Sequence, residues 1–113
     1  MNEKKAIERY IDAMSEGDWV ALSECFTLKC RFFDFCPIGY EMANYHLYGR
    51  EAIEMFYYNK FFFKTVIISD PVIQDDYTAN YLVAYAGQYL HVLAKIEKLS
   101  EDGLIAEMTV RPA

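Results

Sequence analysis

Two side chains in this sequence have the chemistry of a proton-transfer site, the carboxylate of Asp34 and the phenol of Tyr10. Asp34 lies in an aromatic, strand-like run over residues 29–36, where burial would desolvate its carboxylate and raise its pKa. A carboxylate with a raised pKa accepts a proton more readily near neutral pH. Tyr10 lies in a helical stretch, and its hydroxyl is suited to donate to an oxygen on which negative charge develops. Each residue also has a structural alternative: Tyr10 as a core phenol bonded to the backbone, and Asp34 in a salt bridge with Arg31, Lys95 or Arg111.

The other reactive side chains give weaker signals. His91 is expected on a strand beside Tyr89, where it is either an acid–base group or a partly exposed strand histidine, and His46 is expected on a surface loop. Two histidines with scattered carboxylates do not supply the converging ligands that a zinc ion requires, so we expect no metal and no cofactor. Cys36 is expected to be a small buried hydrophobe, because a reactive thiol needs an imidazole or a cation beside it.

Helical periodicity predicts the elements that would hold these groups in the first half of the chain. The first stretch has one apolar face, formed by Ile7, Tyr10, Ile11 and Met14. Gly17 is expected to end this helix, and Asp18 is a good N-cap for a second one. A third helix is predicted over about 50–59, with a buried face formed by Ile53, Phe56 and Tyr57.

The remaining elements are predicted to be strands. The strand over 29–36 ends at Pro37, and residues 37–49 are expected to form an ordered loop that is long enough to act as a lid. Further strands are expected over 65–68 and 72–73, with Pro71 marking an edge or a bulge, and over 77–85, 88–99 and 104–111. Asp102-Gly103 predicts the last hairpin turn. The order of elements predicts an α+β fold, in which a curved antiparallel sheet wraps around three helices from the N-terminal half. We expect a single domain over 1–113.

Three short motifs carry a family resemblance. They are Arg9-Tyr10-Ile11-Asp12-Ala13-Met14 followed by Gly17-Asp18, Cys36-Pro37-Ile38-Gly39, and Gly49-Arg50-Glu51-Ala52-Ile53. In this order they resemble the ketosteroid isomerases, the SnoaL-like polyketide cyclases and the wider nuclear-transport-factor-like superfamily. The resemblance covers nearly the whole chain. It implies a cone with an internal apolar pocket, into which Tyr10 and Asp34 would point.

The resemblance also shows where this chain departs from the isomerases. Tyr10 stands at the position of their oxyanion-hole tyrosine. Their catalytic aspartate directly precedes Pro-x-Gly, and here that residue is Cys36; Asp34 lies two residues earlier, on the same strand face and about 7 Å away. Their second oxyanion donor, a protonated aspartate, would fall at Lys95, or at Ala94 or Ile96 in a neighbouring register. The resemblance therefore implies a related site with Asp34 as general base and Tyr10 as oxyanion donor, not the complete steroid-isomerase set.

Composition narrows the range of partners. The chain has 113 residues and a formal net charge of −6, without the basic stripe that nucleic acid or an anionic membrane would require. The three cysteines form no disulfide framework, and no apolar run approaches the length of a membrane span, so we expect a cytoplasmic protein. Ten tyrosines and eight phenylalanines suit a semi-polar pocket or an association surface.

Three kinds of function remain open. The first is a cofactor-independent isomerase, cyclase or dehydratase acting on a small apolar or aromatic molecule. The second is a binding module without catalysis, and the third is a protein-interaction domain; fold alone does not decide among them. The resemblance implies a homodimer formed through the outer face of the sheet. We expect the ligand to contact Phe32, Cys36, Phe56, Tyr57, His91 and Met108.

Overall fold

The computed structural model describes residues 4–36, 44–85 and 88–113. The helices are α1 (Ala6–Glu16), α2 (Trp19–Glu24) and α3 (Arg50–Phe62). The strands are β1 (Phe26–Asp34), β2 (Tyr45–Tyr48), β3 (Ile67–Ile73), β4 (Thr78–Tyr85), β5 (Gln88–Leu99) and β6 (Ile105–Pro112). The predicted α+β fold is confirmed.

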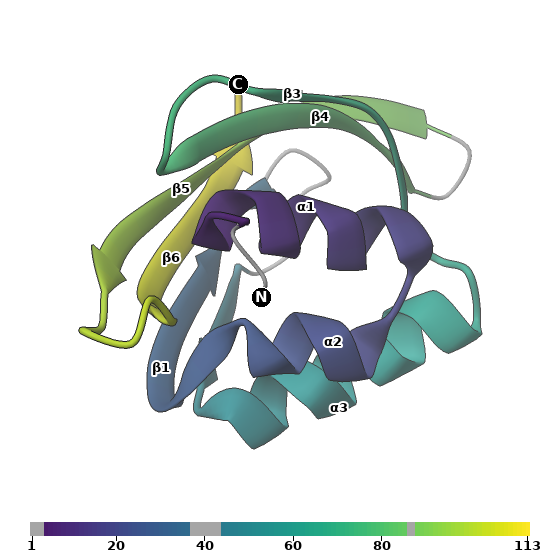
Figure 1. Cartoon of the computed structure of the whole chain (residues 1–113). Coiled ribbons are helices and arrows are strands. Elements are labelled where there is room, and N and C mark those ends of the chain that lie inside the picture. Colours follow the sequence, from purple (N-terminus) through teal and green to yellow (C-terminus); the bar gives the residue numbers. More distant parts are fainter. Residues whose placement is uncertain (1–3, 37–43, 86–87) are drawn as a thin grey trace.

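The strands form one curved, six-stranded sheet in the order β2-β1-β6-β5-β4-β3 (Figure 1). The sheet is mixed, which corrects the expectation of a purely antiparallel one: β1 runs parallel to β6, and the other neighbours are antiparallel. A tight turn forces antiparallel pairing, but β1 and β6 lie far apart in the sequence, so no turn sets their direction. The sheet curves around the helices, with α1 against β3 and β4 and with α2 beside α3 (Figure 1).

Local signals in the sequence place the helices. Gly17 adopts a left-handed conformation (φ 68°) and ends α1, while the Asp18 carboxylate accepts the backbone N–H of Ala21 at 3.0 Å and caps α2. The Arg50 guanidinium donates twice to the carbonyl of Phe26, at 2.9 and 2.6 Å. These two bonds join the start of α3 to the start of β1. The strand that carries Asp34 and the helix that carries Tyr57 are thereby fixed relative to each other.

The structure differs from the expected elements in several places. Part of the segment expected to be a loop forms β2, because Tyr45–Tyr48 pairs with the second half of β1. Residues 37–43 of that segment lie outside the described residues. Helix α3 continues to Phe62, three residues beyond the expected end, and β1 begins at Phe26 and ends at Asp34. Asp70, next to Pro71, has a positive φ of 50° within an irregularity of the edge strand β3, as the proline indicates.

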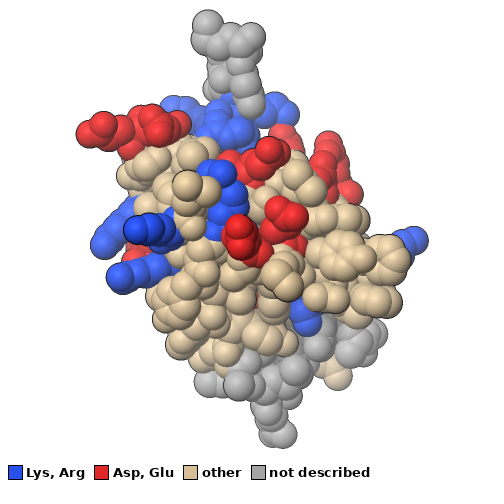
Figure 2. All heavy atoms as spheres, turned by 90° about the horizontal axis from the view of Figure 1, so that it is seen from below, with Lys and Arg blue, Asp and Glu red and all other residues tan. Residues whose placement is uncertain are grey.

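The concave face of the sheet and the helices enclose the core. Large side chains in it with no exposed surface include Tyr10, Phe26, Phe32, Leu22 and Ile53. Among the described residues, no helix is long and apolar enough to span a membrane. On the face seen from below, basic and acidic side chains are interspersed in the upper part of the view, and uncharged residues fill most of the lower part (Figure 2).

Candidate functional site

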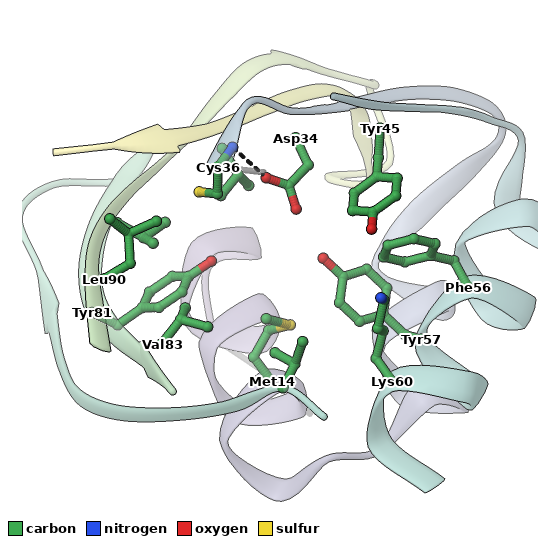
Figure 3. A pocket seen from close by; sticks show the side chains of 13 residues that line it. Met14, Asp34, Cys36, Tyr45, Phe56, Tyr57, Lys60, Tyr81, Val83 and Leu90 are labelled. Carbon is green, nitrogen blue, oxygen red and sulfur yellow. Dashed lines mark hydrogen bonds between the residues drawn. The ribbon is translucent and has the colours of Figure 1, made fainter. Parts of the chain in front are cut away.

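A cavity of about 60 Å³ lies between the curved sheet and helices α1 and α3 (Figure 3). Its volume is several times the roughly 10–15 Å³ that one buried water requires on the same measure. It is lined by Met14, Asp34, Cys36, Tyr45, Phe56, Tyr57, Lys60, Val66, Tyr81, Val83, Leu90, Val92 and Val110. Most of this wall is apolar. The polar atoms are therefore few, and they converge on a common space.

Asp34 is the carboxylate of the cavity. It is the last residue of β1, between Tyr45 of β2 and Val110 of β6. One carboxylate oxygen accepts the backbone N–H of Cys36 at 2.9 Å, and the other points into the cavity (Figure 3). Burial raises the pKa of Asp34; hydrogen bonds from the backbone and the side chain of Cys36 and the positive charge of Lys60 oppose this rise without cancelling it.

Asp34 does not form a salt bridge with Arg31, Lys95 or Arg111, which was the structural alternative to a role as general base. The ion pairs found within the described part of the chain are Lys4–Asp12, Lys5–Asp76 and Lys95–Glu97. The three basic residues considered as partners for Asp34 therefore do not pair with it. Arg31 and Arg111 are exposed, and the ammonium of Lys95 lies 3.9 Å from Glu97.

Two buried tyrosines form a linked pair beside the cavity. The hydroxyls of Tyr10 and Tyr81 lie 2.8 Å apart, and either oxygen can be the donor. Tyr81 lines the cavity, and Tyr10 lies behind it in the core, with no exposed surface. Burial raises the pKa of both phenols, so both remain protonated donors at neutral pH. When Tyr10 donates to Tyr81, the proton of Tyr81 is available to a molecule in the cavity.

Tyr57 supplies a further hydroxyl from α3. Its side chain is only 4% exposed, and its hydroxyl points toward the space that Asp34 also faces (Figure 3). Within the part of the chain that the structure describes, this hydroxyl has no hydrogen-bond partner. The Tyr57 ring is held edge-on by Phe32, with the ring centroids 6.0 Å apart, and by Phe56 at 5.1 Å. A phenol fixed in this way is suited to donate to a ligand.

The rim of the cavity carries a cation on aromatic rings. The ammonium of Lys60 lies 5.3 Å from the ring centroid of Tyr45 and 5.2 Å from that of Phe56. The two rings contact each other at a centroid distance of 4.8 Å. Cation–π contacts of this length hold the ammonium over the ring faces. Lys60 thus places a positive charge on the cavity wall, and the rings of Tyr45 and Phe56 hold that charge in position.

Cys36 is also part of the wall, but it is not activated. Burial and the neighbouring Asp34 carboxylate raise the pKa of the Cys36 thiol. A thiolate is the nucleophilic form of cysteine, so this environment opposes nucleophilic catalysis. The side chain instead forms part of the surface that keeps Asp34 desolvated.

The structure brings together part of the expected site. Asp34, Cys36, Phe56 and Tyr57 line the cavity. Tyr10 reaches it only through the hydroxyl of Tyr81. The other expected ligand contacts do not line the cavity. Phe32 and Met108 lie opposite each other on neighbouring strands in the buried core. His91 is exposed, and its neighbour Val92 lies on the cavity side of β5. His91 therefore faces away from the cavity.

Sequence reasoning missed Tyr81, Tyr45 and Lys60. The alternation of β4 contained a signal for Tyr81, because Ala79, Tyr81 and Val83 must share one face of the strand. Tyr45 was hidden because its segment was expected to be a loop. Lys60 falls just beyond the expected end of α3, and lysines at helix ends are usually solvated. No motif marks either of these two residues.

The arrangement combines a desolvated proton acceptor with neutral hydrogen-bond donors. The described residues contain no group of three or more His, Cys, Asp or Glu side chains placed to hold a metal ion.

Comparison with known protein families finds no match, and comparison with curated proteins finds none. Solved structures do match. A protein with a cystatin-like fold from Silicibacter pomeroyi has a TM-score of 0.66 and 14% identity, over 94% of this chain and 72% of that one. A ketosteroid isomerase-like protein from Erwinia carotovora has a TM-score of 0.57 and 15% identity, over 95% of this chain and 90% of its own.

A third similar structure holds a small molecule. It is a protein from Catenulispora acidiphila with a ketosteroid isomerase-like fold, in complex with trimethylamine; the TM-score is 0.63 and the identity 14%, over 96% of this chain and 85% of that one. At such identities the likeness shows the fold alone. This chain has the cystatin-like fold of the ketosteroid-isomerase-like proteins, so the resemblance seen in its sequence motifs is confirmed for the fold.

Proposed function

We propose that this protein binds a small carbonyl compound in the cavity and catalyses proton transfer at the carbon next to the carbonyl. The observation that carries the proposal is the convergence of the cavity-facing oxygen of Asp34 with the hydroxyls of Tyr57 and Tyr81 on one largely apolar space (Figure 3). The general class remains the one that the sequence suggests, a cofactor-independent isomerase, cyclase or dehydratase. The donor differs: Tyr81 takes the place expected for Tyr10.

The proposed step uses the groups as follows. The cavity-facing oxygen of Asp34 takes a proton from the α-carbon, and the electron pair of the C–H bond moves to form the C=C bond of an enolate. The negative charge that develops on the enolate oxygen is stabilised by hydrogen bonds from Tyr57 and Tyr81. The Asp34 carboxylic acid then returns the proton to the same or another carbon, which completes an exchange or an isomerisation. Tyr10 acts as a positioning residue, because its bond to Tyr81 orients that hydroxyl.

The size of the cavity supports a small substrate. A space of about 60 Å³ suits a molecule of a few non-hydrogen atoms better than a polycyclic one. The Catenulispora protein with this fold, which is in complex with trimethylamine, supports the same scale of ligand. We therefore infer a monocyclic or short-chain carbonyl compound with a partly apolar body.

The test is hydrogen–deuterium exchange at the α-carbons of cyclopentanone in D₂O, followed by proton NMR. The wild-type chain is expected to accelerate exchange over buffer alone. Asp34→Asn removes the proton acceptor and is expected to lower the enzyme-dependent rate by roughly 10²–10⁴-fold. Tyr81→Phe removes one of two donors and is expected to lower it by about 10–100-fold, since Tyr57 remains.

Two further variants make the exchange result specific. Tyr10→Phe keeps the Tyr81 hydroxyl in the cavity, so this variant is expected to lower the exchange rate less than Tyr81→Phe does. Tyr89→Phe removes the hydroxyl of a tyrosine that is 73% exposed, and it is expected to leave the rate unchanged. Full exchange activity in both Asp34→Asn and Tyr81→Phe would contradict the assignments. Binding without exchange in the wild type would favour the non-catalytic binding module.

We also propose that two copies pair through the convex face of the sheet. The support is a cluster of aromatic rings on that face, in which Phe33 contacts Phe35, His46 and Tyr48 with centroid distances of 6.4, 5.2 and 6.2 Å. Tyr48 is 61% exposed, and aromatic side chains are enriched in protein interfaces. The same clustering explains part of the tyrosine and phenylalanine excess.

A further inference from the structure

Tyr45 is the phenol of the cavity wall that the proposed proton transfer leaves without a role. It lies in β2, and its hydroxyl points into the cavity next to Phe56 (Figure 3). The ring packs against Phe56 at a centroid distance of 4.8 Å, which limits the directions that the hydroxyl can take. Tyr57 and Tyr81 also direct their hydroxyls to this space. The described part of the wall therefore presents three phenol donors beside one carboxylate.

The order of the strands places the carboxylate between two of these donors. Tyr45 is the direct partner of Asp34 in the antiparallel pairing of β2 with β1, so the two side chains lie on the same face of the sheet. Tyr81 is on β4, which lies on the other side of β1 in the sheet order β2-β1-β6-β5-β4-β3. Because the sheet is curved, Tyr81 still faces the cavity, and donor hydroxyls lie on both sides of Asp34 (Figure 3).

The number of donors exceeds what one ligand oxygen can accept. A carbonyl oxygen has two lone pairs and accepts two hydrogen bonds. Tyr57 and Tyr81 fill both positions in the proposed step, which leaves the hydroxyl of Tyr45 to a different atom. Removing a hydroxyl from water is costly unless it finds a partner. The cavity therefore favours a ligand that supplies a second oxygen at Tyr45 over a ligand that does not.

We propose that the substrate class is a short β-dicarbonyl compound whose second carbonyl oxygen accepts a hydrogen bond from Tyr45. This inference rests on the proposed function and deepens it. Asp34 takes a proton from the carbon between the two carbonyls, and the electron pair of the broken C–H bond spreads over both of them. One oxygen of the resulting enolate is bonded by Tyr57 and Tyr81, and the other by Tyr45. The Asp34 carboxylic acid then returns the proton to carbon.

The experiment compares the binding of three ketones under conditions in which each is uncharged. Acetylacetone has the β spacing of its carbonyls, methyl propyl ketone lacks the second oxygen, and acetonylacetone separates its carbonyls by one carbon more. Binding is measured by ¹H–¹⁵N NMR titration of the full chain, with the shifts of residues around the cavity as the readout. The wild type is expected to bind acetylacetone about tenfold more tightly than either of the other two, as for one additional hydrogen bond.

Matched variants then test the role of Tyr45. Tyr45→Phe keeps the ring against Phe56 and removes the hydroxyl. Its preference for acetylacetone over methyl propyl ketone is expected to disappear, while its affinity for methyl propyl ketone stays the same. Tyr48→Phe removes the hydroxyl of a tyrosine in the same strand that is 61% exposed, and it is expected to keep the preference.

The outcomes separate this inference from the proposed function. Equal binding of acetylacetone and methyl propyl ketone by the wild type, or an unchanged preference in Tyr45→Phe, would overturn the assignment of Tyr45. Binding of acetonylacetone as tight as that of acetylacetone would overturn the β spacing. In each of these cases the proposed function stands if the wild type accelerates the exchange of cyclopentanone. If the wild type neither binds the ketones nor accelerates that exchange, the proposed function fails as well.

Discussion

Asp34 illustrates, at the scale of single residues, how the cavity affects the stability of the fold. Burial raises its pKa, which means that the folded chain holds the Asp34 proton more tightly than the unfolded chain does. As the pH rises from the ordinary aspartate value of about 3.9 through the raised folded value, the stability of the folded state falls. Each unit of separation between the two pKa values corresponds to about 1.4 kcal/mol. The ionised carboxylate that the chemistry requires is thus a cost to the fold.

Asp34→Asn is expected to be more stable than the wild type above the folded pKa of Asp34. The amide oxygen can still accept the N–H of Cys36, but the side chain no longer ionises. The difference in unfolding free energy between Asp34→Asn and the wild type should shrink as the pH is lowered. It should level off below the ordinary aspartate pKa. Urea unfolding from acidic to neutral pH measures it. Glu101→Gln, at an exposed turn, controls for the loss of one negative charge. A difference that does not change with pH would contradict the prediction.

The site also shows which residue roles a sequence can and cannot reveal. Asp34 and Tyr57 line the cavity, and strand alternation and helix periodicity specify the face of the element on which each of these side chains lies. Tyr10 was expected to reach the ligand, but whether a phenol ends in a cavity or behind another phenol depends on packing between elements. Neither the Tyr10–Tyr81 bond nor the position of Lys60 over two rings has a local sequence signal. Both require the three-dimensional arrangement of α1, α3 and the sheet.

At the scale of elements, the connection between α1 and α2 depends on one glycine. Gly17 has a φ of 68°, and a Cβ added there would meet Phe61 at an ordinary distance of 3.8 Å. The limit on substitution is therefore the backbone conformation and not lack of space. Because α1 carries Tyr10 and Met14 toward the cavity, this turn also positions the site.

Gly17→Ala is expected to destabilise the fold by roughly 1 kcal/mol, the cost of a left-handed conformation for a residue with a Cβ. Gly17→Asn is the matched variant, since asparagine adopts this conformation more easily, and it is expected to lose less. Urea unfolding measures both. Equal stability of Gly17→Ala and the wild type would show that the turn relaxes to another conformation.

The elements themselves were largely predictable, and the exceptions have physical causes. Periodicity and capping residues correctly predicted the three helices, and Asp102-Gly103 predicted the hairpin before β6, where Gly103 has a φ of 78°. The strand β2 was missed because four residues rich in tyrosine and flanked by turn-forming residues give no clear alternation. The parallel pairing of β1 with β6 was missed because pairing between distant strands leaves no local pattern.

At the scale of the whole molecule, the two faces of the sheet have different proposed roles. The concave face holds the cavity, and the convex face carries the ring cluster around Phe33. Pairing through the convex face would bury that cluster and leave the cavity side to the ligand. Ligand binding and association would then be separate properties of the same sheet.

The proposed pairing predicts the mass of two chains in light scattering coupled to size-exclusion chromatography. Phe33→Glu places a charge in the middle of the ring cluster and is expected to give the mass of one chain, because desolvating an unpaired carboxylate in an interface is unfavourable. Tyr58→Glu, on the exposed face of α3, is the matched control and is expected to remain paired. The mass of one chain for the wild type would refute this assembly.

The proposed proton transfer requires a carboxylate that is kept partly out of water inside the cavity. The direct measurement is an NMR titration of the carboxyl carbon of Asp34 in the folded chain. The predicted midpoint lies above the aspartate reference of about 3.9, and it rises further in Lys60→Met because an opposing positive charge is removed. A midpoint at or below that reference would mean that Asp34 is solvated, and the proposed proton transfer would be contradicted.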